Sequence, residues 1–546
     1  MSNEQFGQKN WTRLKVWLPL LFSMTAVIGM VFGFKLKSTS PQTVKNQGIR
    51  TMSSKGSVGK LEEMLRFIES KYVDEVDREE LIDRAIESIL DELDPHSNYI
   101  SKDQLKSVNE SLDGHFDGIG VQIYRLRDTV MIVDVIPDGP SEKAGIQIGD
   151  QLITVDDSLV AGNDLSNADI ITMLRGAKGD PVKIGVLRKG ETEIQQIEVI
   201  RDKIPDNSVD THYKVDDQTG YIKVSRFSST TYEEFMTALE EMYDDGIEDL
   251  IIDLRGNPGG YLSAATKIAD QLFDNARQLI VYTEGRSQRR NEYKSSGRNF
   301  FNLDEIAVLV DEGSASASEI LAGAVQDWDR GSLIGRRTFG KGLVQEQYKL
   351  SDGSALRLTV ARYYTPSGRS IQKPYDHGDA EEYDHETSDR FLTGELLSRD
   401  SIKISDSTEY RTASGRLVFG GGGIIPDHFV PIEEEYDNRY FRNALTFTPE
   451  FVYDFVTKSM DSFYAFETIA DFQKRFKVTD EMYAEFEQLV ASKDISGSSQ
   501  DKAEAKDLLL HHLKAQFGQY FFKEEGYFQV LNSKDPVFNK ALDIIE

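Results

Sequence analysis

Residues 249–260 read DLIIDLRGNPGG, an apolar run that ends in a stretch rich in glycine and proline. A short apolar run bounded by turn residues is typical of a buried strand in an α/β sheet. The second half cannot continue a strand or a helix, because proline lacks a backbone N–H and fixes its own φ angle. Since α/β folds place binding and catalytic groups in loops at strand ends, we expect a functional loop at residues 255–260.

The segments around this stretch alternate between strand and helix patterns. Residues 220–224 and 306–310 are further predicted strands, whereas residues 232–243 and 316–328 carry apolar side chains at helical spacing. Strands and helices that alternate along the chain are typical of an α/β fold. We therefore predict an α/β core in this part of the chain.

Shorter strand patterns, separated by glycine, occupy residues 105–203. The segment Gly118-Ile119-Gly120-Val121 and the turn residues that follow it make this stretch resemble a PDZ domain. In such a glycine loop, converging N–H groups bind a terminal carboxylate while the peptide adds a strand to the sheet edge. Alone, the Gly-x-Gly tripeptide is equally a turn before a strand, and the whole run carries the resemblance.

Residues 16–34 form an uncharged run of nineteen residues, VWLPLLFSMTAVIGMVFGF. A helix of this length spans about 28 Å, close to the hydrocarbon thickness of a bilayer. We predict a transmembrane anchor that holds residues 1–15 in the cytoplasm, because Lys9, Arg13 and Lys15 precede it. A cleaved signal peptide is the alternative, although no A-x-A-like site follows the run. The expected location is a bacterial cell envelope, with a single pass through the inner membrane and the rest on the periplasmic or outer face.

The composition excludes several classes of function. Lys and Arg number 63 against 92 Asp and Glu, and a net charge of −29 repels the phosphates of a nucleic acid. The chain has no cysteine, so disulfides, thiol nucleophiles and thiolate metal ligands are excluded together. We expect no nucleic acid partner.

Two further regions have helical patterns without a legible activity. Residues 58–93 carry apolar positions at helical spacing with a break near residues 73–77, which favours two helices. Residues 438–546 are helical in pattern and rich in aromatic side chains. We expect His511 and His512 there to be an exposed pair on a helix, because no third metal ligand lies at a suitable spacing.

The segment at residues 313–320, GSASASEI, follows a predicted strand and begins a predicted helix. Ser316 and Glu319 fit the S-x-x-E capping box, so a simple helix start is one interpretation. A serine at such a junction can also act as a nucleophile, since the free N–H groups of the first turn can bind an oxyanion. Both interpretations stay open on these residues alone.

A serine nucleophile needs a base, and histidine is the usual one. None of the eight histidines lies in a recognisable signature, and G-x-S-x-G is absent. A lysine of lowered pKa is another base, because burial disfavours its charged form. Lys341, in FGKG at residues 339–342, is the candidate, and a solvated surface lysine is the alternative. Residues 335–341 also match the start of a P-loop, but Gly342 replaces the Ser or Thr that binds Mg²⁺ and a strand pattern follows, so we reject nucleotide binding.

Together these segments resemble the C-terminal processing (tail-specific) peptidases, serine proteases of the Ser-Lys type with a PDZ domain. The resemblance covers roughly residues 58–372 and 423–427, through LDPHS at 93–97, the PDZ run, DLRGNPGG at 253–260, SASASE at 314–319, TFGKG at 338–342 and YYTPSG at 363–368. It implies a multidomain α/β protease core (crotonase-like β/α) with an inserted PDZ domain, an N-terminal helical segment and a C-terminal helical extension.

The resemblance also implies roles for individual residues. Ser316 is the expected nucleophile, Lys341 its general base, and Gln345 the residue that orients the amine. The backbone N–H groups of Ala317 and Gly260 are expected to bind the oxyanion. We expect neither a metal nor a cofactor, because acyl transfer to serine needs none.

Other positions and partners follow less directly. Asp327 matches an aspartate near the family's site and is expected to be structural, with an exposed helix carboxylate as the alternative. Arg175 is a candidate for coupling the PDZ domain to the core, or else a surface arginine. Expected partners are protein or peptide C-termini, the cytoplasmic membrane, and a second copy of the chain or an adaptor. A membrane-tethered PDZ adaptor without activity and a histidine-based serine hydrolase are the rival functions.

The predicted organisation has nine segments. They are a cytoplasmic N-terminus (1–15), a transmembrane anchor (16–34), a tether (35–57), an N-terminal helical region (58–104), a PDZ domain (105–203), a Ser-Lys protease core (204–372), an acidic insertion (373–419), a return to the core (420–437) and a C-terminal helical extension (438–546). The insertion is polar and rich in Asp and Ser, so we expect a surface excursion.

Overall fold

The computed structural model describes residues 58–545, apart from residues 127, 163–164, 376–379, 434–435, 437 and 460–465. The chain divides into two compact units between Arg84 and Ala85, and each is described by itself. The predicted anchor (16–34) and tether (35–57) lie outside the described residues. Within the described ranges, no helix combines the length and the apolar character needed to cross a bilayer.

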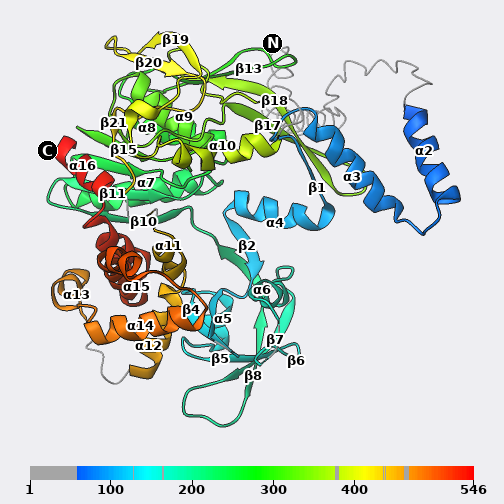
Figure 1. The fold of residues 1–546 in the computed structure, drawn as a ribbon, viewed down its shortest axis with the longest axis vertical. Coiled ribbons are helices and arrows are strands. Elements are labelled where there is room, and N and C mark those ends of the chain that lie inside the picture. Colours follow the sequence, from blue (N-terminus) through cyan, green and yellow to red (C-terminus); the bar gives the residue numbers. More distant parts are fainter. Residues whose placement is uncertain are drawn as a thin grey trace, which may run out of the picture. The chain divides into compact units, whose positions relative to one another are not determined.

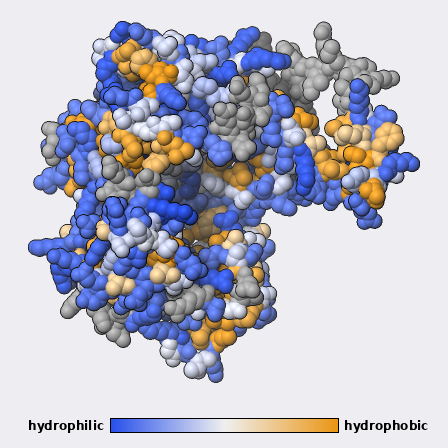
Figure 2. All heavy atoms as spheres, viewed as in Figure 1, coloured by the Kyte–Doolittle hydropathy of each residue, from blue (hydrophilic) through white to orange (hydrophobic). Residues whose placement is uncertain are grey.

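Two helices supply the described part of the first unit. These are α2 (Val58–Lys71) and the start of α3 (Arg78–Asp91), which confirms the two helices predicted here and the break near residues 73–77. Arg78 joins them through Glu62 at 3.0 Å and Glu69 at 2.8 Å. Figure 2 shows an apolar patch in this region, where Leu61, Met64, Phe67 and Val73 have exposed side chains.

The quoted stretch at residues 249–260 begins as an inner strand of a six-stranded sheet in the second unit. In spatial order the strands are β10 (Val209–Lys214), β11 (Thr219–Val224), β12 (Asp249–Asp253), β15 (Ile306–Val310), β16 (Ser332–Gly335) and β21 (His428–Phe429). β10 runs antiparallel to β11, and the other neighbours are parallel. Ile252 of β12 pairs with Ile222 and Val308, and all three are fully buried. The loop after β12 therefore leaves from the carboxyl edge of the sheet.

Helices cover both faces of this sheet. α7 (Thr231–Asp244), α8 (Leu262–Leu272) and α9 (Ala317–Asp327) share one apolar cluster with Ile252. The last helix of the chain, α16 (Pro536–Ile545), packs on the other face, where Phe538 joins the cluster of Ile251 and Leu309. Successive residues of a strand point to opposite faces, so Ile251 and Ile252 serve different layers. Figure 1 shows α16, drawn in red, beside the strands of the core.

A second, antiparallel sheet carries the segment after Lys341. It contains β1 (Asn98–Ile100), β18 (Ala355–Tyr364), β13 (Leu279–Glu284) and β14 (Asn291–Lys294), with β17 (Leu343–Lys349) also paired to β18. The strand β17 confirms the strand pattern on which nucleotide binding was rejected. The likeness of the whole core to the crotonase fold stays a prediction.

The predicted PDZ region is inserted between α4 (Lys102–Asp113) and β10. β2 (His115–Gly118) leads into the region and β9 (Asp202–Pro205) leads out of it, as an antiparallel pair. Its sheet holds β3 (Val121–Leu126), β4 (Thr129–Val135), β5 (Gln151–Val155), β7 (Pro181–Leu187) and β8 (Gln195–Ile200), with β6 (Ser158–Leu159) paired to β5. Two helices, α5 (Pro140–Ala144) and α6 (Asn167–Leu174), complete it.

The predicted C-terminal extension has an apolar core of its own. The helices α11 (Arg439–Leu445), α12 (Thr448–Ser459), α13 (Ile469–Arg475), α14 (Asp480–Ser492) and α15 (Ser499–Asn532) share a cluster rich in phenylalanine. α15 is interrupted at Phe522 and Lys523, whose backbone angles are not helical. His511 and His512 on α15 are 7% and 6% exposed, so the expectation of an exposed pair is wrong: they face the interior between α15 and its neighbours.

The acidic insertion at residues 373–419 lies mostly at the surface and buries a few of its side chains against the core. It forms α10 (Ala380–Leu392), a 3-10 turn (Arg399–Ser401) and the hairpin of β19 (Asp406–Arg411) and β20 (Leu417–Gly420). Arg390 is 2% exposed and donates to the carbonyls of Arg337, Thr338 and Phe339. Most described residues of the insertion are exposed, in line with a surface excursion, but the buried Arg390 holds the loop that leads to Lys341.

Candidate active site

Ser316 lies at a sharp turn between β15 and α9. Its φ and ψ angles are 54° and −108°, a region that a residue with a Cβ atom rarely adopts. The backbone strain persists because the turn is held on both sides: the Ser316 N–H donates to Glu319 Oε2 at 2.9 Å, and Ala315 N–H donates to the Asn257 carbonyl. This turn places the serine at the first turn of α9, where N–H groups have no partner within the helix.

Lys341 lies in the loop between β16 and β17, and its amine is directed by Gln345. Lys341 Nζ donates to Gln345 Oε1 at 3.1 Å, and Gln345 Nε2 donates to the carbonyl of His96. The second bond fixes which end of the amide faces the lysine. Burial lowers the pKa of Lys341, and the positive charge of Arg357 lowers it further. An amine of lowered pKa can accept a proton near neutral pH.

Two buried side chains tie the Ser316 turn to the Lys341 loop. Glu319 accepts four hydrogen bonds, from the N–H groups of Ser316 (2.9 Å), Gly340 (2.8 Å) and Lys341 (2.9 Å) and from the hydroxyl of Thr338 (2.6 Å). The Tyr363 hydroxyl lies 3.0 Å from the Ser316 carbonyl and 2.7 Å from the Lys341 carbonyl. Burial raises the pKa of Glu319 to about 7, against the lowering effect of its four donors. The capping-box interpretation of Ser316 and Glu319 is thus compatible with a site at Ser316.

Two backbone N–H groups beside Ser316 have no acceptor among the described residues. Gly259 N–H is used by Asn257 Oδ1 at 2.9 Å, which leaves Gly260 N–H and Ala317 N–H. A Cβ atom at Gly259 would lie 2.7 Å from Ser316 Cβ and 2.9 Å from Ala317 N, so only glycine permits this approach. Of the two glycines, only Gly260 therefore has an N–H group without an acceptor among the described residues.

These residues line one cavity of about 670 Å³. Ser316, Ala317, Gly260, Lys341 and Gln345 all lie on its wall, so the structure brings the five predicted residues together. No hydrogen bond joins Ser316 Oγ to Lys341 Nζ within the described part of the chain, and the amine donates to Gln345.

Asp327 lies outside this cavity and has a structural position. It is 3% exposed, pairs with Arg369 at 2.8 Å and accepts the Ser367 N–H at 2.9 Å. The alternative interpretation of Asp327 as an exposed helix carboxylate is therefore wrong, because the side chain points inward from α9. The pair holds the turn after β18 against the end of α9.

The predicted peptide-binding loop is at the start of the β3 strand. Gly118 ends β2, Ile119 is buried, and Gly120 has a φ angle of 73°. Strand β3 pairs with β4 alone among the described strands, so its other edge can take a peptide strand. Val121 is the first residue of that edge. Arg175 pairs with Glu110 of α4 at 3.3 Å and stacks on Phe116, so it contacts the connection between the PDZ region and the core.

The LDPHS segment supplies a support that residue-by-residue reasoning did not find. Asp94 accepts the N–H groups of His96 and Ser97 and the hydroxyls of Ser97 and Thr359. This turn places the His96 carbonyl against Gln345. The ring of His96 bonds Tyr383 at 2.9 Å, and burial lowers its pKa to about 4. The motif itself was the only signal in the sequence.

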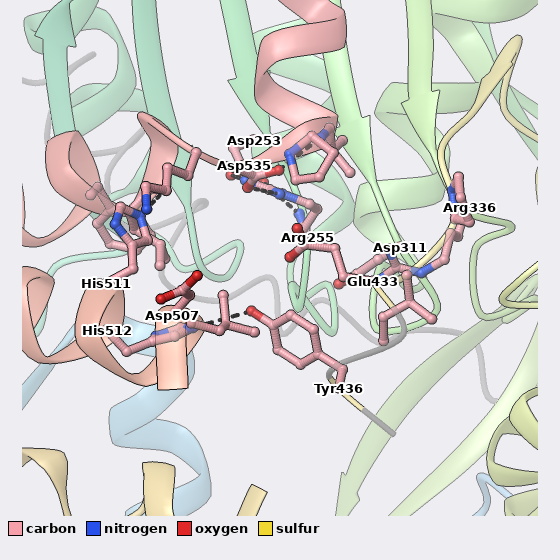
Figure 3. Close-up of a pocket in the computed structure, with 18 of the residues that line it drawn as sticks. Asp253, Arg255, Asp311, Arg336, Glu433, Tyr436, Asp507, His511, His512 and Asp535 are labelled. Carbon is pink, nitrogen blue, oxygen red and sulfur yellow. Dashed lines mark hydrogen bonds and ion pairs between the residues drawn. The ribbon is translucent and has the colours of Figure 1, made fainter. Parts of the chain in front are cut away.

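A second cavity, of about 520 Å³, is lined by Arg255 from the loop after β12 and by residues of α15 and α16 (Figure 3). Arg255, from the loop, pairs with Asp253 at 2.6 Å and with Asp535 at the start of α16. Lys223 pairs with Asp253, and Arg336 pairs with Glu312. His511, His512 and Asp507 of α15 line the facing wall. No group of three or more residues suited to a metal ion occurs within the described ranges.

Comparisons with known proteins agree with this arrangement. A family described as "Peptidase family S41" matches residues 218–379, and "PDZ domain" matches residues 118–199. "Activating protease CtpB N-terminal domain" matches residues 23–104, and a family of unknown function matches residues 442–523.

Individual relatives match over most of their length. The chain is 31% identical to a probable CtpA-like serine protease of Staphylococcus haemolyticus (strain JCSC1435), over 75% of this chain and 80% of the relative. It is 34% identical to the carboxy-terminal processing protease CtpB of Bacillus subtilis (strain 168), over 65% of this chain and 73% of the relative. The solved photosystem II D1 C-terminal processing protease is 30% identical over 58% of this chain and 85% of its own, with a TM-score of 0.34.

The matches and the domain arrangement together define a serine protease that carries a PDZ domain. The chain belongs to peptidase family S41 and, within it, to the carboxy-terminal processing proteases.

Proposed function

We propose that this protease cleaves peptide bonds with Ser316 as nucleophile and Lys341 as general base. The observation that supports the proposal most is the amine of Lys341, which is partly buried, has a lowered pKa and is oriented by Gln345 in the cavity of Ser316. A neutral amine takes the proton of Ser316 Oγ while Oγ attacks the carbonyl carbon. The N–H groups of Ala317 and Gly260 bind the oxyanion that forms.

The remaining steps return the proton. The tetrahedral intermediate collapses, the C–N bond breaks, and the lysine ammonium protonates the leaving amine. Water then attacks the acyl-enzyme with the amine as base. The bond between the acyl carbon and Ser316 Oγ breaks, and the lysine ammonium returns the proton to Oγ as the second product leaves. Every step uses groups of this chain and water, so the proposal includes no metal or cofactor.

Substrate selection is proposed to occur at the PDZ domain. A protein C-terminus would bind the loop at Gly118–Val121 and extend along the free edge of β3, with the upstream chain at Ser316. We further propose that residues 16–34 anchor the protein in the inner membrane of a bacterium, with the protease on the periplasmic or outer face. Association with a second copy or an adaptor is part of the same proposal.

The experiment that tests the function is mass spectrometry of an unstructured protein with an apolar C-terminal tail, incubated with residues 51–546. Tail-dependent fragments from the wild type and none from Ser316→Ala support a tail-directed serine protease. Intact substrate with bound tail in both would favour the inactive PDZ adaptor.

A histidine-based mechanism is the second rival, and His96 is the histidine nearest in role. Its pKa of about 4 keeps it neutral, but its ring bonds Tyr383 and it offers Gln345 only its backbone carbonyl. If His96→Phe abolished cleavage while Lys341→Ala did not, the Ser-Lys proposal would be wrong.

A further inference from the structure

The catalytic cavity holds a second cation, Arg357, whose charge has no partner in the described part of the chain. Arg357 lies on β18 and lines the cavity together with Ser316 and Lys341. Its guanidinium donates no hydrogen bond and pairs with no carboxylate among the described residues. A partly buried guanidinium with five N–H donors and no acceptor is costly unless a ligand supplies one.

Other arginines of low exposure in this molecule do have acceptors. Carboxylates or carbonyls accept from Arg201, Arg226, Arg255, Arg336, Arg337, Arg369 and Arg390. The contrast is sharpest with Arg226, which lines the same cavity and pairs with Asp206 at 2.7 Å. Arg357 therefore differs from the arginines that stabilise this fold.

The register of the second sheet places Arg357 near the reacting groups. Arg357 pairs across the ladder with Gln347, and Thr359 pairs with Gln345, so these side chains share one face of the β17–β18 pair. Diagonal neighbours on one face lie about 7–8 Å apart, within reach of a long side chain. Arg357 is thus one step along the sheet from the residue that directs the Lys341 amine.

The groups that face Arg357 leave its charge uncompensated. Tyr261 is the side chain that acts on the pKa of Arg357. Its phenol is uncharged near neutral pH, because burial raises its own pKa. On the other side, Arg357 lowers the pKa of Lys341, which means that the two basic groups sense each other across the cavity. A negative group on a bound substrate would find a cation already in place.

We propose that Arg357 is a specificity residue that binds a carboxylate of the substrate close to the scissile bond. The inference rests on the proposed Ser316–Lys341 site and adds a substrate class to it: segments with an acidic residue beside the cleavage point. A guanidinium suits this ligand because it can donate two parallel hydrogen bonds to one carboxylate. The carboxylate has two sources, the side chain of Glu or Asp, or the C-terminus of a short tail.

The test is a set of peptides with one fixed apolar tail in which Glu or Gln is placed in turn at three positions on each side of the mapped cleavage site. For the wild type, at least one position is expected to favour Glu over Gln by about 10-fold or more in kcat/KM. Arg357→Gln should remove that preference, and Arg357→Glu should invert it toward a Lys-containing peptide.

Matched variants separate this proposal from its alternatives. Arg226→Gln, in the same cavity but with its own carboxylate partner, should keep the Glu preference. If amidation of the peptide C-terminus, rather than Glu→Gln, removes the Arg357-dependent part of the rate, the terminal carboxylate is the ligand. A wild-type Glu/Gln ratio near one at every position, with no effect of amidation that depends on Arg357, overturns the proposal.

Failure of the underlying mechanism looks different. In that case Ser316→Ala or Lys341→Ala would still cleave the Gln peptides, whatever the preference for Glu. If both variants are inactive while the wild type cleaves Glu and Gln peptides equally, the catalytic pair stands and the role of Arg357 alone is wrong.

Discussion

The loop after β12 contributes residues to two cavities of similar size whose charges are organised differently. In the second cavity, Arg255, Lys223 and Arg336 each lie against a carboxylate. In the catalytic cavity Arg226 pairs with Asp206, but Lys341 and Arg357 have no carboxylate partner among the described residues. A charged side chain that is paired with another stabilises the fold. One without a partner can still bind a charged group of a substrate or take part in proton transfer.

The difference follows from the surroundings of each cavity. The wall formed by α15 and α16 brings Asp535 to Arg255, and the fully buried Asp253 completes that network. Glu319 is the carboxylate that affects the pKa of Lys341 most. It accepts hydrogen bonds from the backbone N–H groups of Gly340 and Lys341, and none from the amine. Desolvation without a counter-charge is what lowers the pKa of a lysine.

The largest expected effect comes from removing the unpaired amine itself. Lys341→Ala should lower kcat/KM by about 10³-fold or more, because the serine loses its base. Members of one catalytic unit are strongly non-additive, so Lys341→Ala with Ser316→Ala should cost little more than either change alone. Peptide kinetics on the three variants measures this. Lys349→Ala, an exposed lysine at the end of β17, is the matched control, and near-normal turnover in Lys341→Ala would rule out the pair.

A smaller loss is expected when the two halves of the site are no longer tied together. In Glu319→Gln, one side-chain oxygen becomes an N–H₂ group that faces two donors, so buried N–H groups lose their acceptor. We expect kcat/KM to fall by about 10²-fold and the free energy of unfolding by about 2–4 kcal/mol. Urea denaturation and peptide kinetics test both.

The dependence of stability on pH is a separate test of the role of Glu319. Its folded-state pKa of about 7 lies above the ordinary 4.5, so the folded protein binds more protons than the unfolded chain between these values. Stability from this group is full below about pH 4.5 and is lost as the pH rises through 7. Glu319→Gln should flatten that slope, and an unchanged slope would assign it to other groups.

The sequence was sufficient for the elements that depend on local patterns. The strands around residues 249–260, the helix at Ser316 and the break between α2 and α3 were predictable, because apolar periodicity and glycine-proline loops determine them. The residues of the catalytic cavity came from motifs, and their convergence needed the fold: Gln345 meets His96 across 249 positions in the chain.

The sequence was less informative in regions where burial depends on distant partners. His511 and His512 looked like an exposed pair, since nothing near them in the sequence indicates the wall that covers them. Arg390 lies in a polar insertion, yet it is buried because three carbonyls of the Lys341 loop accept from it. Likewise, α16 belongs to a helical extension by pattern and to the core sheet by packing.

The ion pair between Arg255 and Asp535 in the second cavity can be tested by changing Asp535. Asp535→Asn keeps an acceptor for the Val537 and Phe538 N–H groups at the start of α16 but removes the ion pair with Arg255. Because the same loop continues into Gly260, the proposed oxyanion donor, we expect kcat/KM to fall by about 10-fold with little change in thermal stability. Asp543→Asn on the exposed side of α16 is the control. Full activity in Asp535→Asn would show that the scaffold does not depend on this pair.

The smallest effect concerns how the two unpaired cations act on each other. A neutral amine is required, so kcat/KM should rise with pH and level off above the lowered pKa of Lys341. Arg357 disfavours the lysine ammonium, so Arg357→Gln should raise the pKa of Lys341 and move the midpoint of the profile to higher pH by about 0.5–1 unit.

Two variants decide whether the charge of Arg357 is the cause. Arg357→Lys keeps a cation at the same place and should restore the wild-type midpoint, whereas Arg362→Gln, an exposed arginine on the same strand, should leave it unchanged. A midpoint that does not move in Arg357→Gln would mean that burial, and not the charge of Arg357, lowers the pKa of Lys341. The charge of Arg357 would then act on the substrate and not on Lys341. Peptides with Glu and with Gln distinguish the two roles, because only the Glu peptide brings a carboxylate that neutralises Arg357.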